Sequence, residues 1–464
     1  MLLFLACTTP EPPPAESDSD APACMAPAGE PARSAWGGDS RVTLSATSFF
    51  RLEQICGRDW LVDPEGHPLR SLGVNTLGPQ GSTGQVTGRA RYAEAVDTLY
   101  ADDQAWAATE VARLRSWGLN TAGAWSSTTL LAEAGLAVTP ILYLSGGDWQ
   151  SGTVADWWDP AWELAVAAKV EAEVRPFEKS PAVIGWFLDN EMRWGPDWRG
   201  PETLLELYLG LGPEAPGKAA AVDHLLAELG EVAGVNTVLG TTFSDRQAML
   251  AQRDWSLLAT SSVADAQTSA FLSKAAARYF GITTAAIRAV DADHLILGNR
   301  DVSVMTPAEV YEAQAPFVDV VSINNYVFMP GIAELALQLS GGLDPSDGFV
   351  AQHTITNRPI LISEFGFRAA DSGLPNSWPP QYPTYATQAE RSQAARDYVA
   401  TYRAVPWVVG WHWFEWVDQP AEGRFDGEDN NWGLVNEADV PYPELTTALT
   451  EMSVEMTEDL LITK

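Results

Sequence analysis

Eight short apolar runs alternate with amphipathic helical segments, which predicts an α/β protein folded as a (β/α)₈ TIM barrel. The length of 464 residues exceeds the ~250 residues of a typical barrel, and loops or insertions can hold the excess. With 46% hydrophobic and 19% charged residues, the chain can bury one large core. We therefore expect one barrel domain over residues 47–464, with an N-terminal hairpin and a helical insertion after the fourth strand.

The first residues form a short apolar run, MLLFLAC, which ends in a small residue and Cys7. Residues 8–46 follow as a Pro-rich, acidic stretch that is too polar to pack, so we expect a disordered linker. This arrangement resembles a bacterial lipoprotein signal over residues 1–7, in which Cys7 would carry the lipid. Because no Lys or Arg precedes the apolar run, an ordinary or truncated signal peptide is the alternative. Either interpretation predicts an extracytoplasmic protein, lipid-anchored at a bacterial membrane or secreted.

Two apolar runs, 49–52 and 59–62, flank a Gly-containing turn and predict the leading hairpin. The eight barrel strands are expected at 69–75, 121–125, 138–144, 183–188, 295–299, 318–324, 360–363 and 408–413. Amphipathic segments between them predict helices at 103–117, 162–177, 271–290 and 388–402. Residues 198–267 interrupt the repeat with two or three extra helices, which we expect to wall the active-site face.

The composition also limits the partners and cofactors. A formal net charge of −33 repels phosphate backbones and anionic membranes, which excludes nucleic acid and favours a neutral ligand. The same charge is typical of a solvated surface that identifies no ligand. Three Cys and five scattered His lack zinc-ligand spacing, so we expect no metal or other cofactor. Cys24 and Cys56 could pair in an oxidising compartment, and a monomer is expected.

Two carboxylates follow apolar strands at the end where barrel enzymes place catalytic groups. The fourth strand, in VIGWFLDNEMRWG, ends in Asp189, Asn190 and Glu191, and the seventh, in RPILISEFGF, leads to Ser363 and Glu364. Three βα units and the insertion separate them, so the two glutamates can face each other across the barrel mouth. Glycoside hydrolysis requires such a pair, because one carboxylic acid protonates the leaving oxygen while the other carboxylate attacks or stabilises the anomeric carbon.

Either glutamate alone could instead form an ion pair with Arg193 or Arg368, since such pairs are common where loops begin. The combination is more specific, because Asn190-Glu191 on strand four with Glu364 on strand seven resembles the signature of glycoside hydrolase clan A. A closer resemblance, to the β-agarases of family 50, runs from about residue 49 to the end of the chain. Its motifs are DNEMRWG, VAGVNTVLGTTF, HLILGNR, VVSINNY, VGWHWFEWVDQP, GRFDGEDNNWGLVN and PYPEL.

This resemblance implies a retaining glycoside hydrolase with Glu191 as general acid/base and Glu364 as nucleophile. It also implies that Asn190 hydrogen-bonds the sugar hydroxyl beside the reacting carbon and that Tyr326 orients Glu364. Trp413 on strand eight would form the platform beneath the sugar in the cleaved subsite, with a core position as the alternative.

Four further strand-end residues are weaker candidates for substrate contacts. Asn75 and Arg300 could contact hydroxyl groups or brace loops, and Trp125 and Trp411 could line the cleft. His412 lies beside Trp411, so only one of the two faces the barrel lumen, and the sequence leaves open which.

The chain departs from the family in two places. Phe365 stands where those agarases usually carry a His after the nucleophile, and a short segment precedes the barrel where they have a large sandwich-like region. The substrate therefore stays open among neutral β-linked glycans, which include agarose and other β-galactans, β-glucans and mannans. A transglycosylase using the same covalent intermediate is one alternative, and a non-catalytic carbohydrate-binding lipoprotein is an alternative of another class.

Overall fold

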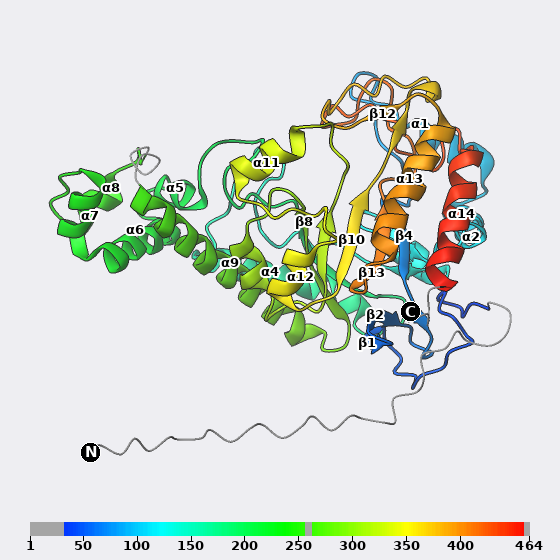
Figure 1. Ribbon diagram of the computed structural model, residues 1–464, viewed down its shortest axis with the longest axis horizontal. Helices are drawn as coiled ribbons and strands as arrows, with labels where there is room; N and C mark the ends of the chain where they lie inside the picture. The colour runs from blue at the N-terminus through cyan, green and yellow to red at the C-terminus, as the bar shows by residue number, and fades with distance from the viewer. Residues whose placement is uncertain (1–31, 256–261, 459–464) are drawn as a thin grey trace, which may run out of the picture.

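The computed structural model of the chain describes residues 32–255 and 262–458. It consists of a barrel of strands with helices around it and a helical arm that extends from the barrel (Figure 1). Cys7 and Cys24, for which we considered a lipid anchor and a disulfide bond, lie outside the described residues. Cys56 is disulfide-bonded. Within the described ranges, no helix has the length and hydropathy needed to span a membrane.

The expected hairpin is present at the N-terminal end of the barrel. Strand β1 (Arg51–Ile55) pairs antiparallel with β2 (Arg58–Val62), and β2 also pairs with β3 (Pro68–Leu69). The turn between β2 and β3 is closed by Asp63, whose side chain accepts two backbone N–H groups, and by Gly66 with a φ of 95°. These are the two residue types that favour such turns.

Eight parallel strands form the barrel, and each corresponds to an apolar run in the sequence. Their bounds are β4 (Ser71–Val74), β5 (Thr121–Ala122), β6 (Ala137–Val138), β7 (Gly185–Asn190), β8 (Leu295–Val302), β9 (Val321–Asn324), β10 (Ile360–Phe365) and β13 (Val408–Trp413). The hydrogen-bonded order is β6-β5-β4-β13-β10-β9-β8-β7. Parallel bridges from Val138 to Val183 and from Ile141 to Phe187 close the ring between β6 and β7. The prediction of a (β/α)₈ barrel is confirmed.

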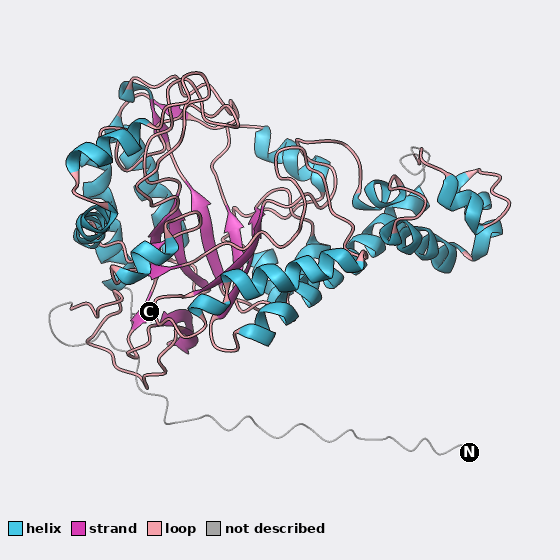
Figure 2. Cartoon of the chain, turned by 180° about the vertical axis from the view of Figure 1, so that it is seen from behind, coloured by secondary structure: helices cyan, strands magenta, loops and turns pink. Residues whose placement is uncertain are grey.

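Helices follow the strands and cover the outside of the barrel (Figure 2). They are α1 (Arg91–Leu99), α2 (Asp103–Ser116), α3 (Thr128–Glu133), α4 (Pro160–Glu173), α10 (Ala308–Gln314), α11 (Ile332–Ser340), α12 (Val350–Thr356), α13 (Gln388–Arg403) and α14 (Pro443–Glu458). Helix α2 has clear end signals, because Asp102 caps its first turn through the N–H of Ala105 at 2.8 Å and arginines occupy its last turn. A short parallel pair, β11 (Arg368–Ala369) and β12 (Thr384–Tyr385), follows β10.

Apolar side chains fill much of the lumen beside a few buried polar ones such as Ser71 and His412, so the barrel is a packed core. Ile184, Phe187, Leu297 and Val320 belong to one buried cluster, which also takes in Leu61 of the hairpin. The hairpin therefore closes the N-terminal end of the lumen, and the opposite end is left for the polar groups that follow the strands.

The structure shows which side chains of β13 face the barrel lumen. His412 points into the barrel, where its Nε2 lies 2.8 Å from Ser71 Oγ, and burial lowers the pKa of this imidazole to about 3. Trp411 and Trp413 point outward into the cluster between barrel and helices. Gly410 permits the close strand packing here, because a Cβ at this position would lie 2.1 Å from the Ser71 carbonyl oxygen.

The insertion after β7 contains four short helices, where we expected two or three. They are α5 (Leu204–Leu209), α6 (Pro216–Leu229), α7 (Glu231–Leu239) and α8 (Arg246–Ala251). Together with the long helix α9 (Ser262–Val290) they form an arm directed away from the barrel (Figure 1). Helices α5 and α6 also contact the loop that follows β6, where Tyr208 donates to the Ala155 carbonyl oxygen and Asp156 accepts from the Gly217 N–H. The expectation that these helices wall the active-site face stays a prediction. The turn at residues 197–200, where the insertion begins, does lie beside the barrel mouth.

Candidate active site

Glu191 lies one residue beyond β7, at the C-terminal mouth of the barrel. Its φ of 45° is left-handed, and its N–H donates to the carbonyl oxygen of Arg300 on β8 at 3.0 Å. The carboxylate accepts two hydrogen bonds, one at Oε1 from the amide of Asn324 at 3.1 Å and one at Oε2 from the indole of Trp149 at 3.1 Å. A non-glycine residue in this conformation is uncommon and strained, and such residues cluster at functional sites.

Glu364 lies within β10 and is only 7% exposed. Its Oε1 accepts a hydrogen bond from the Tyr326 hydroxyl at 2.6 Å. Its Oε2 lies 2.9 Å from the Arg300 guanidinium and 3.3 Å from the Asn324 amide. These three donors favour the ionised form of the carboxyl group.

A single amide nitrogen, Asn324 Nδ2, connects the two glutamates. Its distances of 3.1 Å to Glu191 and 3.3 Å to Glu364 limit the separation of those two oxygens to their sum, 6.4 Å at most. The same nitrogen also lies 3.1 Å from Asn190 Oδ1, and hydrogen bonds from one amide nitrogen are not collinear, so the separation of the two glutamate oxygens is smaller than that limit. The two catalytic carboxyl groups are ~5–5.5 Å apart in retaining glycosidases and ~6.5–9.5 Å apart in inverting ones. The upper limit of 6.4 Å between the Glu191 and Glu364 oxygens is below the inverting range.

The two arginines that could have paired with the glutamates, Arg193 and Arg368, have other partners. In the part of the chain that the structure describes, Arg193 pairs with Glu202 at 2.7 Å, and Arg368 donates to carbonyl oxygens of a neighbouring loop. The cation beside Glu364 is Arg300 instead. The glutamate pair is thus not a set of ordinary loop-end salt bridges.

Arg300 braces the site from inside the barrel. Its guanidinium donates to Asn190 Oδ1 at 2.7 Å and to Asn75 Oδ1 at 3.1 Å, and Asn75 in turn donates to the carbonyl oxygens of Ser363 and Trp413. Asn75 and Arg300 are both fully buried. Their positions therefore favour the bracing role over the hydroxyl contact that we also considered.

The charges around Glu364 act in opposite directions on its acidity. Burial and the charge of Glu191 raise the pKa of Glu364 to about 7, while Arg300 and the Tyr326 hydroxyl act to lower it. Tyr326 itself remains a donor, because burial and the charge of Glu364 raise its pKa well above 10. Ionised and protonated Glu364 are therefore both accessible close to neutral pH.

Three of the predicted substrate-binding residues lie at the mouth with the glutamates. Asn190 Oδ1 accepts bonds from both Arg300 and Asn324. Tyr326 contacts Glu364 directly, and the Trp125 ring lies 4.2 Å from the Arg300 guanidinium. Trp125 is partly exposed, so part of its surface is open to a ligand.

Trp413 and Trp411 have no open ring face in this structure. Trp413 is 0% exposed, its indole N–H donates to the Trp432 carbonyl oxygen at 2.8 Å, and it packs against Phe365 at 5.3 Å. Trp411 is 1% exposed and packs against the same phenylalanine. This placement argues against a platform or cleft-lining role and fits the core alternative, because outward-facing positions of β13 meet the surrounding helices.

The prediction from sequence missed Asn324, Trp149 and Arg199. Asn324 ends β9 in VVSINNY and follows the same strand-end rule as the glutamates, so that rule could have found it. Trp149 and Arg199 lie on loops, and their contacts with Glu191 depend on how those loops fold back. No strand-end pattern marks such positions.

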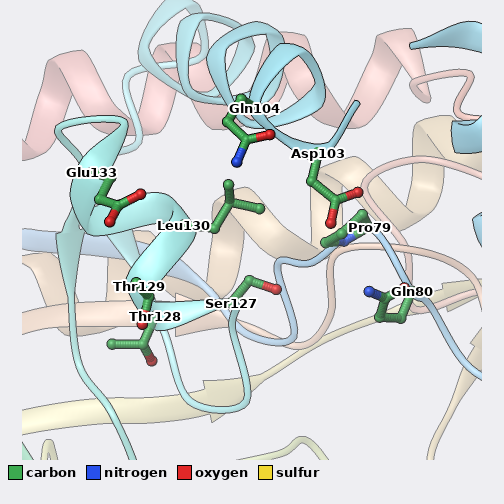
Figure 3. A pocket seen from close by; sticks show the side chains of 9 residues that line it. All are labelled: Pro79, Gln80, Asp103, Gln104, Ser127, Thr128, Thr129, Leu130 and Glu133. Carbon is green, nitrogen blue, oxygen red and sulfur yellow. The ribbon is translucent and has the colours of Figure 1, made fainter. Parts of the chain in front are cut away.

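Neither glutamate lines either of two hollows in the structure. The first, about 400 Å³, lies beside α2 and α3 (Figure 3). Its lining consists of Pro79, Gln80, Asp103, Gln104, Ser127, Thr128, Thr129, Leu130 and Glu133. The second, about 480 Å³, is lined in part by Trp125 and Tyr143 and so adjoins the site at Arg300. Among the described residues, no cluster of His, Cys, Asp and Glu has the geometry of a metal site.

Comparison with known proteins supports the resemblance. β-Agarase A of Vibrio sp. (strain JT0107) is 29% identical over 390 residues, which cover 79% of this chain and 37% of that protein. β-Agarase B of the same organism is 25% identical over 498 aligned positions, which cover 92% of this chain and 50% of that protein. This chain thus spans at most half the length of the curated relatives it matches. No family model matches the chain.

A solved structure shows the same architecture. The agarase AgWH50C superposes with a TM-score of 0.77 and 25% identity, covering 93% of this chain and 68% of that one. The likeness to family 50 β-agarases indicated by the motifs is confirmed.

Proposed function

We propose that this chain is a retaining glycoside hydrolase that cleaves a neutral, β-linked glycan of the agar type. The observation that carries the proposal is the pair Glu191 and Glu364 at the barrel mouth, which share the amide of Asn324. Similarity to β-agarases supports the agar-type substrate, and the net charge of −33 favours a neutral glycan over an anionic one.

In the first step, ionised Glu364 attacks the anomeric carbon while Glu191 protonates the departing oxygen. Arg300 and the Tyr326 hydroxyl stabilise the Glu364 carboxylate before attack. Asn324 donates to both glutamates, so it holds nucleophile and acid at a fixed spacing. The products are a covalent glycosyl-enzyme ester and a released sugar.

In the second step, Glu191, now ionised, removes a proton from water, which attacks the ester and restores the original configuration. The Trp149 indole donates to Glu191 Oε2 at 3.1 Å and stabilises this carboxylate. Asn190 is anchored through Oδ1, which leaves its amide N–H groups for the sugar hydroxyl beside the reacting carbon.

A polysaccharide screen tests the proposal. Purified protein is incubated with agarose, agar oligosaccharides, β-glucan and β-mannan. New reducing ends are measured, with the Glu364→Gln variant as the control. We expect reducing ends from the agar-type substrates with the wild type only. Proton NMR of the earliest product should show the β-anomer, and an initial α-anomer would refute the retaining mechanism.

A further inference from the structure

Trp198 presents a large aromatic surface at the barrel mouth. It lies at the tip of a turn closed by a bridge between Asp197 and Gly200, and it is 51% exposed. The guanidinium carbon of Arg199 lies 4.2 Å from the centroid of its ring. A cation therefore covers one face of the ring, while half of the residue stays exposed to solvent.

The Arg199 guanidinium beside this ring is hydrogen-bonded to the backbone of Glu191. Arg199 donates through Nη1 to the backbone carbonyl oxygen of Glu191 at 3.0 Å and to that of Trp149 at 3.1 Å. Its Nε donates to Asp197 at 2.9 Å, and its side chain is only 3% exposed. The position of the Trp198 ring is therefore determined by the same buried guanidinium that braces the backbone of Glu191.

A second indole fills the space between the ring and the carboxylate. Trp149 donates to Glu191 Oε2 at 3.1 Å, and its ring centroid lies 6.4 Å from that of Trp198 at an angle of 58°. The two loops are in close contact, since a Cβ on Gly152 would lie 2.9 Å from the Cβ of Arg199. Trp149 therefore contacts both Glu191 and the Trp198 ring, which places Trp198 next to the residue that lines the carboxylate.

We propose that Trp198 is the platform for a sugar unit on the leaving-group side of the scissile bond. This inference rests on the proposed function, in which Glu191 protonates the departing oxygen and so lies on that side. The axial C–H groups of a β-linked pyranose form an apolar face that matches an open indole face. Stacking there would orient the leaving sugar, and in the reverse direction an acceptor sugar, toward Glu191.

A matched set of variants tests the proposal. Trp198→Ala removes the ring, Trp198→Phe retains an aromatic face, and Leu164→Ala changes another exposed apolar side chain, on α4. Each is assayed with agar oligosaccharides and with a glycosyl fluoride of the retained configuration, whose leaving group has neither a sugar nor a ring that could stack. We expect Trp198→Ala to lower kcat/KM about tenfold on the oligosaccharides and to leave the glycosyl fluoride within about twofold. Trp198→Phe should recover most of the loss, and Leu164→Ala should match the wild type.

Equal losses on both substrates would overturn the proposal, because the ring would then support Glu191 rather than hold a sugar. A binding measurement separates this outcome from failure of the proposed function. In a Glu364→Gln background, calorimetry with agar oligosaccharides should show about tenfold weaker binding when Trp198→Ala is added. If the wild type hydrolyses no substrate, the proposed function fails, and the platform is still supported or refuted by this binding difference.

Discussion

Replacing Tyr326 with Phe removes one hydrogen bond from the proposed nucleophile and leaves the ring in place. The hydroxyl donates to Glu364 Oε1 at 2.6 Å, and this bond favours the ionised carboxylate. Without it the pKa of Glu364 should rise above its value of about 7. A hydrogen bond to a charged group contributes about 1.5–3 kcal/mol, and 1.36 kcal/mol corresponds to one pKa unit, so the rise should be about 1–2 pH units.

The assay is the pH profile of kcat/KM, which reports the pKa values of the free enzyme. Since Glu364 must be ionised to attack, wild-type kcat/KM should rise with pH through about 7. In Tyr326→Phe this acidic limb should move to higher pH. At pH 6 the loss should be about 10–100-fold, because below its pKa the ionised fraction falls tenfold for each pH unit. Near pH 9 the variant should approach the wild type.

Tyr385→Phe on β12 is the matched control, because it removes the same hydroxyl from a half-buried tyrosine that packs against Phe367. Its profile should superpose on that of the wild type. A Tyr326→Phe profile that drops equally at every pH would refute the reasoning, since the hydroxyl would then affect geometry and not the ionisation of Glu364. A limb displaced to lower pH would show that the sign is wrong.

Three further predictions concern the site and the scaffold. Glu364→Ala should abolish turnover, and azide should restore it with a product of inverted configuration, measured by NMR. Azide added to Glu191→Ala should instead give a product of retained configuration. The opposite pattern would exchange the roles of the two glutamates. Asn324→Asp adds a carboxylate beside both glutamates, so kcat/KM at pH 7 should fall at least about tenfold, and an unchanged rate would contradict the bridging role. Asp102→Ala removes the cap of α2 and should lower the free energy of unfolding in urea by about 1 kcal/mol with unchanged kcat/KM, and a loss of activity would contradict this scaffold role.

The sequence was sufficient to predict the barrel and the meeting of Glu191 with Glu364. Each strand is a short apolar run, and parallel closure brings all C-terminal strand ends to one rim, whatever the lengths of the connections. The position of a carboxylate directly after a run therefore determines its place on the rim. The same rule covers Asn324 at the end of β9.

The neighbours of these side chains could not be predicted in the same way. The resemblance predicts Trp413 as a platform, but alternation along β13 turns it toward the helices and places His412 in the lumen. Two-residue periodicity alone does not say which set of side chains faces inward. For Arg300 the sequence leaves a hydroxyl contact and a bracing role equally open, and the structure favours bracing because Arg300 donates to Asn75 and Asn190. For the arm, amphipathic patterns indicate that helices exist but not which surface they pack against.

Helix α9 has consequences for the hydrodynamics of the molecule. Its 29 residues extend about 44 Å at 1.5 Å per residue, and it carries α5 to α8 at its far end (Figure 1). A compact chain of this length has a radius of gyration of about 23 Å, so one helix is nearly twice as long as that radius. The molecule should tumble anisotropically and sediment more slowly than a sphere of equal mass. A fluorophore or immobilising tag on α7 would therefore sit at the end of the arm, away from the barrel, where it leaves the approach of a polymeric glycan unobstructed (Figure 1).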